Sequence, residues 1–209
     1  MTPTMPGVSD SITDRAPVAQ SRRVVVLLAI LAGLCWAGTL TLLLWGLVDR
    51  QQSYAAPERL LYYGLALLAA LLTFVPAERQ FGLTGLAFEG TFGSILLLYT
   101  LAFVPPPTGW LLSPPDTPIY ALMAVAVFLF VSSLAMPLLY ALGQRLFRQR
   151  ARRYDARRAR RQAYEVGTLA AMAVGLAGLR VLTPVAVVLL ALIIAVAELL
   201  FLSFAETDS

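Results

Sequence analysis

The sequence predicts an all-α integral membrane protein: a polytopic bundle of about six transmembrane helices with both the N- and the C-terminus in the cytoplasm. Three observations lead to this prediction. The chain is 59% apolar and only 13% charged, it contains a series of long apolar runs, and its arginines are concentrated in one segment. Soluble domains are about 45–50% apolar and about 25% charged, so this chain has too few charges to cover a water-facing surface.

The two ends of the chain are polar. Residues 1–20 are rich in Pro, Ser, Thr and Asp without an apolar period, so we expect a disordered cytoplasmic tail. A second short tail is expected at 205–209. Residues 21–143 hold four predicted transmembrane helices, and the first, from about Val24 to Val48, is long enough to cross about 30 Å of hydrocarbon.

The second predicted span runs from about Leu60 to Val75, with Pro57 in its first turn and Pro76 at its end. The third apolar stretch, Phe81 to Val104, has a glycine-rich first half that also carries an acid. This half either begins a transmembrane helix near Leu83 or forms a re-entrant turn inside the bundle. We favour the single helix.

The fourth span is predicted at Ile119 to Leu142, after an external loop at 105–118 that contains six prolines. Thr117 and Pro118 suit the N-cap and first position of this helix. Pro137 lies inside it and should bend it. No Gly or Pro occurs between Gln144 and Val166, so we expect the helix to extend into the cytoplasm and to turn near Tyr154 and Asp155.

Two further apolar segments, Val166 to Leu182 and Val185 to Phe204, fill residues 166–204. One helix across both would be about 58 Å long, which is too long for a single span. Thr183 and Pro184 separate them, so we predict a transmembrane helical hairpin. If its first helix does not cross the membrane, the C-terminus lies outside the cell and the rest of the topology is unchanged.

Arginine sets the predicted orientation. With the N-terminus inside, thirteen of the sixteen arginines fall in cytoplasmic segments and three in external loops, a strong positive-inside bias. The chain has no lysine, and arginine without lysine in an Ala- and Leu-rich chain is typical of GC-rich codon usage. We therefore expect a multi-pass protein of a bacterial inner membrane.

The segment 144–165, an arginine-rich cytoplasmic loop or helix extension, is the main candidate binding site. Its nine arginines are Arg145, Arg148, Arg150, Arg152, Arg153, Arg157, Arg158, Arg160 and Arg161. Each basic residue near an anionic leaflet contributes about 1 kcal/mol, so the segment could hold anionic lipid or an acidic partner protein firmly. The alternative is a topology determinant with no other role. Nucleic acid is disfavoured, because only Tyr154 and Tyr164 offer stacking faces there.

Three ionisable residues fall inside predicted spans: Glu89, Glu198 and Arg180. Such residues are costly in a membrane and are candidates for function, here a proton or cation site. Both glutamates fall towards the cytoplasmic side and Arg180 towards the outer side, so we expect no direct Glu198–Arg180 pair. We favour the simpler interpretation, in which each glutamate reaches headgroup water or pairs with an arginine of the loop.

Small residues in the spans predict close helix packing, within the chain or against another subunit, and we favour packing within the chain. The candidates are Ala29, Gly33, Ala37, Gly90, Gly93, Gly175 and Gly178.

Catalytic and metal chemistry find little support in the sequence. The chain has no histidine and a single cysteine, Cys35, so it offers no His- or Cys-based metal cluster, no internal disulfide and no Ser-His or Cys-His pair. No nucleophile motif and no phosphate-binding loop is present. We therefore expect no enzyme, no metal and no cofactor. The favoured function is an accessory or scaffold subunit of a larger membrane assembly, and the alternative is a small transporter or channel using Glu89 and Glu198.

Overall fold

The computed structural model describes residues 22–51, 53–146 and 155–207, and this part of the chain contains six α-helices and no strand. In chain order they are α1 (Arg22–Leu44), α2 (Pro57–Phe81), α3 (Leu86–Phe103), α4 (Thr117–Leu146), α6 (Ala156–Gly178) and α7 (Pro184–Thr207). Four of the described helices, α1 to α4, are long and apolar enough to cross a membrane. The prediction of an all-helical chain is confirmed for the described residues, and the length and composition of these four helices suit a membrane protein.

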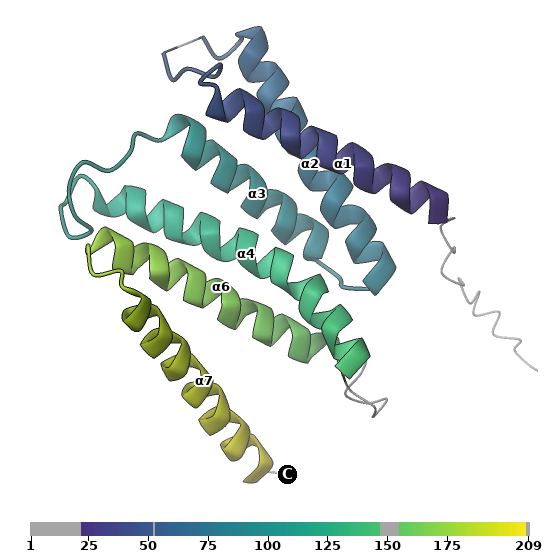
Figure 1. Cartoon of the computed structure of the whole chain (residues 1–209), viewed down its shortest axis with the longest axis vertical. Coiled ribbons are helices and arrows are strands. Elements are labelled where there is room, and N and C mark those ends of the chain that lie inside the picture. The colour runs from purple at the N-terminus through teal and green to yellow at the C-terminus, as the bar shows by residue number, and fades with distance from the viewer. Residues whose placement is uncertain (1–21, 52, 147–154, 208–209) are drawn as a thin grey trace, which may run out of the picture.

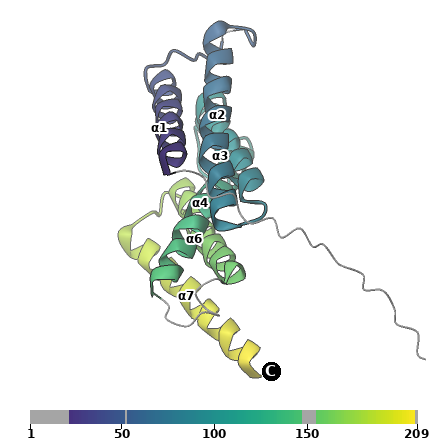
Figure 2. The ribbon, with the colours of Figure 1, turned by 90° about the vertical axis from the view of Figure 1, so that its right-hand side faces the viewer.

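The helices lie side by side in chain order and alternate in direction (Figure 1). Each packs mainly on its neighbours in the chain, most extensively α4 on α6 and least α6 on α7. The view turned by 90° places α1 at one edge of the row and α7 at the other (Figure 2). The array is therefore open, a detail that the predicted bundle of about six helices left undefined.

The two ends of the row differ in charge. One end of the row holds the start of α1, the turn between α2 and α3, the end of α4, the start of α6 and the end of α7 (Figure 1). We call this the arginine end, because Arg145, Arg157, Arg158, Arg160 and Arg161 lie there. The other end, the loop end, holds the connections at 45–56, 104–116 and 179–183.

The C-terminal ends of α1 and α2 differ from the sequence prediction. Helix α1 stops at Leu44, four residues before the predicted end, because Gly46 takes a positive φ of 66° that turns the chain. Pro76 does not end α2, and this prediction was wrong. The helix continues to Phe81 and ends where Gly82 takes a φ of 65° and donates its N–H to the carbonyl of Glu78. An interior proline removes one backbone hydrogen bond, and in a membrane helix neighbouring groups compensate for the loss.

The glycine-rich stretch after α2 is a short turn followed by one helix. Helix α3 starts at Leu86, three residues later than predicted, and runs through to Phe103 without a re-entrant segment. The carboxylate of Glu78 accepts a hydrogen bond from the backbone N–H of Ala87 at 2.6 Å, which satisfies one of the free donors at the start of α3.

The proline-rich connection at the loop end is folded around Asp116, which is buried and accepts hydrogen bonds from the N–H groups of Thr108 and Gly109 at 3.0 and 2.8 Å. Thr117 is not the predicted N-cap: it is already helical, and its hydroxyl donates to the carbonyls of Leu111 and Ser113. Pro137 lies inside α4, as predicted.

The arginine-rich segment is helical in its second half, where it forms the first ten residues of α6. Asp155 caps this helix by accepting a hydrogen bond from the N–H of Arg158 at 3.1 Å. The predicted fifth helix therefore begins at Ala156 instead of Val166 and ends at Gly178 instead of Leu182. It is not among the four described helices that could cross a membrane, and α7 has a described apolar stretch of only Pro184–Leu200. Two helices form here, as the predicted hairpin requires.

Two clusters of buried apolar residues hold the row together. One lies towards the arginine end, around Phe74, Leu86, Met136 and Ala163, and joins α2, α3, α4 and α6. The other lies towards the loop end, around Tyr62, Leu98 and Ala102 of α2 and α3, and includes Val48 from the chain after α1.

Candidate functional site

The most extensive helix contact among the described residues, between α4 and α6, fixes the position of the polar residues of α6. Ala159, Ala163 and Gly167 recur every four residues on one face of α6, and all three are buried. A Cβ at Gly167 would lie 2.9 Å from the backbone oxygen of Phe128 and would collide with the hydroxyl of Ser132, both on α4. The absence of a side chain at Gly167 therefore lets α4 and α6 approach closely.

On one side of α6, Tyr164 and Arg160 reach the start of α3. The Tyr164 hydroxyl donates to the Glu89 carboxylate, 3.2 Å from Oε1 and 3.3 Å from Oε2. The Arg160 guanidinium donates to the carbonyl of Thr84 in the turn before α3. A Cβ at Gly85 would lie 3.7 Å from Arg160 Nη2 and 3.9 Å from Glu89 Oε1, so both side chains pack over this glycine. Burial and the neighbouring Glu89 charge raise the pKa of Tyr164, which keeps its hydroxyl a hydrogen-bond donor.

On another side of α6, Arg161 and Glu165 reach α7. Arg161 Nη2 forms an ion pair with Glu198 Oε1 at 3.1 Å, and Arg161 Nε lies 3.9 Å from Glu165 Oε1 one turn further along α6. The two carboxyl groups are close enough to share a hydrogen bond. Burial, followed by the hydrogen bond to Glu198 and its charge, raises the pKa of Glu165 to about 7, and Arg161 partly opposes this shift.

Both glutamates of the predicted spans are therefore paired with α6, but only Glu198 has the loop-arginine partner that the favoured interpretation named. Glu198 binds an arginine of the predicted loop, whereas the partner of Glu89 is Tyr164, a residue that sequence reasoning did not assign to it. Arg180 is exposed at the loop end, with a φ of 59° and no contact to Glu198 within the described chain, as predicted.

The nine candidate arginines divide into three groups. Arg145 and Arg157 are exposed, and Arg158 is half-buried. Arg160 and Arg161 are held by contacts within the protein and are structural in part. The remaining four, Arg148, Arg150, Arg152 and Arg153, lie outside the described residues.

The predicted packing glycines divide into those that contact another helix and those that do not. Gly90 packs against the ring of Phe74, Gly93 against the backbone at Leu129 and Phe130, and Gly178 against Tyr120. In contrast, a Cβ at Gly33 or Gly175 would meet nothing within 4 Å. Ala29, Gly33 and Ala37 are exposed on α1, so the favoured prediction that this row packs inside the chain was wrong.

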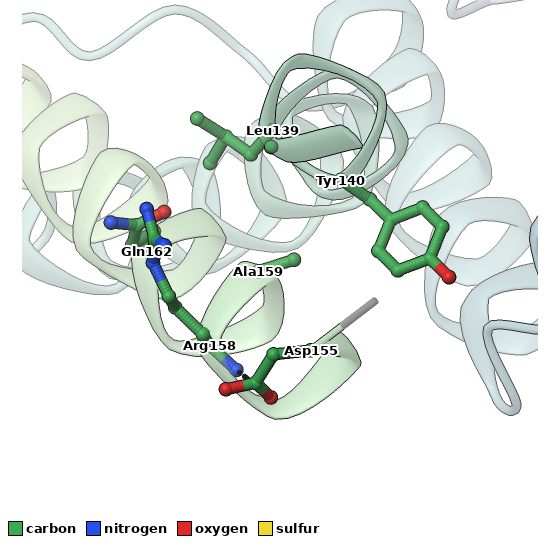
Figure 3. A pocket seen from close by; sticks show the side chains of 7 residues that line it. Leu139, Tyr140, Asp155, Arg158, Ala159 and Gln162 are labelled. Atoms are coloured by element: carbon green, nitrogen blue, oxygen red, sulfur yellow. Dashed lines mark hydrogen bonds between the residues drawn. The ribbon is translucent and has the colours of Figure 1, made fainter. Parts of the chain in front are cut away.

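The cavity beside the arginines is too small for a ligand. It lies between the end of α4 and the start of α6, and it is lined by Leu139 and Tyr140 of α4 and by Asp155, Arg158 and Ala159 (Figure 3). Its volume is about 10 Å³, room for at most one water molecule. Within the described residues no three His, Cys, Asp or Glu side chains are placed to hold a metal ion. A larger apolar groove of about 300 Å³ lies between α2 and α3 towards the loop end.

Sequence reasoning missed three residues of these polar contacts: Glu78, Tyr164 and Glu165. Arg161 and Glu165 are four residues apart on a helix, a spacing that signals a pair once the helix is known. The predicted boundary at Val166 concealed this signal, because it left the segment before it as a loop.

Comparisons with protein-family models, with curated proteins and with solved structures find no match to this chain.

Proposed function

We propose that this chain is a non-catalytic, multi-pass subunit of a bacterial inner membrane, which packs laterally against other membrane proteins and docks an acidic partner or anionic lipid at its arginine end. In the topology predicted from the distribution of arginine, the arginine end faces the cytoplasm. The observation that carries the proposal is the open row of helices, because its two edges offer membrane-embedded surfaces to a neighbouring protein.

The edge helix α1 has the features of a helix that packs against another. Leu27, Ile30 and Leu34 expose more than half of their surface, and the row Ala29, Gly33 and Ala37 is exposed on the same helix. Helix association in lipid depends on close backbone approach at small residues, since apolar side chains gain little from leaving lipid for protein.

The exposed arginines supply the docking surface of the proposal. Arg145 and Arg157 extend from the end of α4 and the start of α6, on either side of the four arginines between them. Arg160 and Arg161 serve a different purpose: they fix α6 to the turn before α3 and to α7, which positions the exposed arginines.

The lateral contact is tested by purifying the tagged protein in a mild detergent at native expression, with mass spectrometry of what remains bound. Gly33→Leu should remove a stoichiometric partner. Gly64→Leu is the matched control, because Gly64 is also exposed and a Cβ at this position would likewise meet nothing within 4 Å. Absence of any stoichiometric partner, or equal retention in both variants, would refute the lateral role.

The docking surface is tested in the same purification. Arg145→Gln combined with Arg157→Gln should weaken retention of an acidic partner and make it more sensitive to salt. Arg79→Gln is the control, because Arg79 is exposed at the same end but belongs to α2. Equal retention in the double variant and the control contradicts the docking role.

The alternative function, a small transporter or channel, requires Glu89 and Glu198 to serve a common path. They contact α6 from different helices and through different partners, and neither lines the small cavity or the apolar groove. Ion or proton flux in liposomes that is lost in Glu89→Gln or Glu198→Gln would replace our proposal with this alternative.

A further inference from the structure

A groove between α2 and α3 runs towards the loop end of the row, remote from the arginine-rich segment. Its floor is formed by the buried side chains of Tyr62, Ala66 and Leu98, and its rim by Leu67 and Ile95, which are exposed by 43 and 38%. The volume of about 300 Å³ is bounded almost entirely by apolar atoms. Such a surface does not suit a polar solute.

The groove is built by the chain and is not a gap between loosely placed helices. Tyr62 ties its floor together by donating a hydrogen bond to the Leu98 carbonyl at 2.9 Å. Ala66 leaves the space open, because its methyl group fills little of the volume between the helices. Aromatic rings close the groove at its side nearest the loop end: the rings of Tyr63 and Tyr99 lie 5.5 and 5.3 Å from the ring of Phe103.

Two guanidinium groups lie near this side of the groove. Arg59 is only 3% exposed, lies 4.7 Å over the Phe103 ring, and donates to the backbone carbonyls of Asp49 and Arg50. Arg59 thereby fixes the chain at Arg50, whose own side chain donates through Nε to the Ala102 carbonyl at 3.3 Å. Arg50 is exposed, and in the described chain it forms no ion pair with a carboxylate. The guanidinium of Arg50 is therefore held near the C-terminal end of α3 through Nε and remains exposed.

The distance between the charge and the apolar groove suits a phospholipid. Ala102, where Arg50 is anchored, and Ile95, on the rim, are seven residues apart on α3, or about 10 Å along the helix axis. Tyr63 and Tyr99 lie between these levels, and within the described residues no protein group accepts a hydrogen bond from either hydroxyl. The order of Arg50, the two tyrosines and the apolar groove matches the order of phosphate, ester and acyl chain in a lipid.

We propose that the groove binds one acyl chain of an anionic phospholipid, with the lipid phosphate at the Arg50 guanidinium and the ester oxygens near Tyr63 and Tyr99. The charge at the mouth selects an anionic lipid over a neutral one, and the groove selects a chain over a free phosphate. This site lies in the leaflet at the loop end, so it is separate from the docking of the arginine-rich segment and does not depend on it.

The test is native mass spectrometry of the detergent-purified full chain after incubation with phosphatidylglycerol or with phosphatidylcholine. The wild-type protein should retain one phosphatidylglycerol in preference to phosphatidylcholine. Arg50→Gln should reduce the retained fraction several-fold, and Ile95→Trp should abolish it by filling the groove from its rim. Because Ile95 is partly exposed, this change does not overfill the buried core.

Two controls separate the site from general lipid contact. Arg180→Gln removes an exposed arginine at the same end of the row, and Leu189→Trp adds the same large ring to α7, where Leu189 is 53% exposed. Both should retain phosphatidylglycerol as the wild type does. If all four variants retain it equally, or if the wild type does not distinguish the two lipids, the proposal is wrong. Loss of the lipid without loss of a protein partner leaves the proposed lateral role intact.

Discussion

The close contact between α4 and α6 at Gly167 provides a quantitative test of the fold. We expect Gly167→Ala to destabilise the protein, because the new Cβ would lie 2.9 Å from the backbone oxygen of Phe128, which cannot move without displacing α4. Forcing one extra carbon into a well-packed contact costs about 1–3 kcal/mol. The same substitution in an unobstructed helix interior stabilises by about 0.5–1 kcal/mol, because alanine has the higher helix propensity.

Gly175 supplies the unobstructed position in the same helix, since a Cβ there would meet nothing within 4 Å. Because the gain in helix propensity is common to both positions, the stabilities of Gly167→Ala and Gly175→Ala should differ by the packing cost alone, about 1–3 kcal/mol. For a protein of this size, each kcal/mol corresponds to about 2–4 °C in Tm. Thermal unfolding in detergent micelles, followed by circular dichroism, measures the difference.

Ser132→Ala provides a second arm of this test. It removes the hydroxyl that the new methyl group would meet but leaves the Phe128 carbonyl in place, so it should restore only part of the stability of Gly167→Ala. Equal Tm values for Gly167→Ala and Gly175→Ala would refute the close α4–α6 contact and, with it, the placement of the α6 polar residues.

Three further predictions concern the polar contacts. The pKa of Glu165 is raised from 4.5 to about 7 in the folded protein, so the contribution of this group to stability is greatest below about pH 4.5 and falls as the pH rises through 7. The Tm of Glu165→Gln should therefore decrease less than that of the wild type over this pH range. Tyr164→Phe deprives the Glu89 carboxylate of its hydrogen-bond donor and should cost about 1–3 kcal/mol, whereas Glu89→Gln, which still accepts the bond, should cost less in the same unfolding assay. Asp116→Ala leaves two backbone N–H groups at the loop end without their acceptor, so limited proteolysis at 104–116 should become several times faster, whereas the exposed control Asp49→Ala should leave the cleavage rate at this loop unchanged.

The sequence could locate the polar residues but not their partners. Glu89 and Glu198 stand out because they interrupt apolar runs, and the arginines stand out by number. Their pairing with Tyr164 and Arg161 joins residues 75 and 37 positions apart, and such contacts depend on which faces of α3, α6 and α7 meet. Likewise, Arg160 and Arg161 have the same composition signal as Arg157, yet only the fold separates structural arginines from exposed ones.

By itself, the sequence determined the helical class, the apolar character of the helices and their approximate order, because apolar run length and charge are local properties of the sequence. It also separated the last two helices at Thr183 and Pro184. Only the tertiary structure decided that α2 passes through Pro76, that α6 begins within the arginine-rich segment, and that the row stays open. These features depend on contacts between helices, which the sequence of a single helix does not specify. Gly90 and Gly167 are buried in such contacts, whereas Gly33 is exposed.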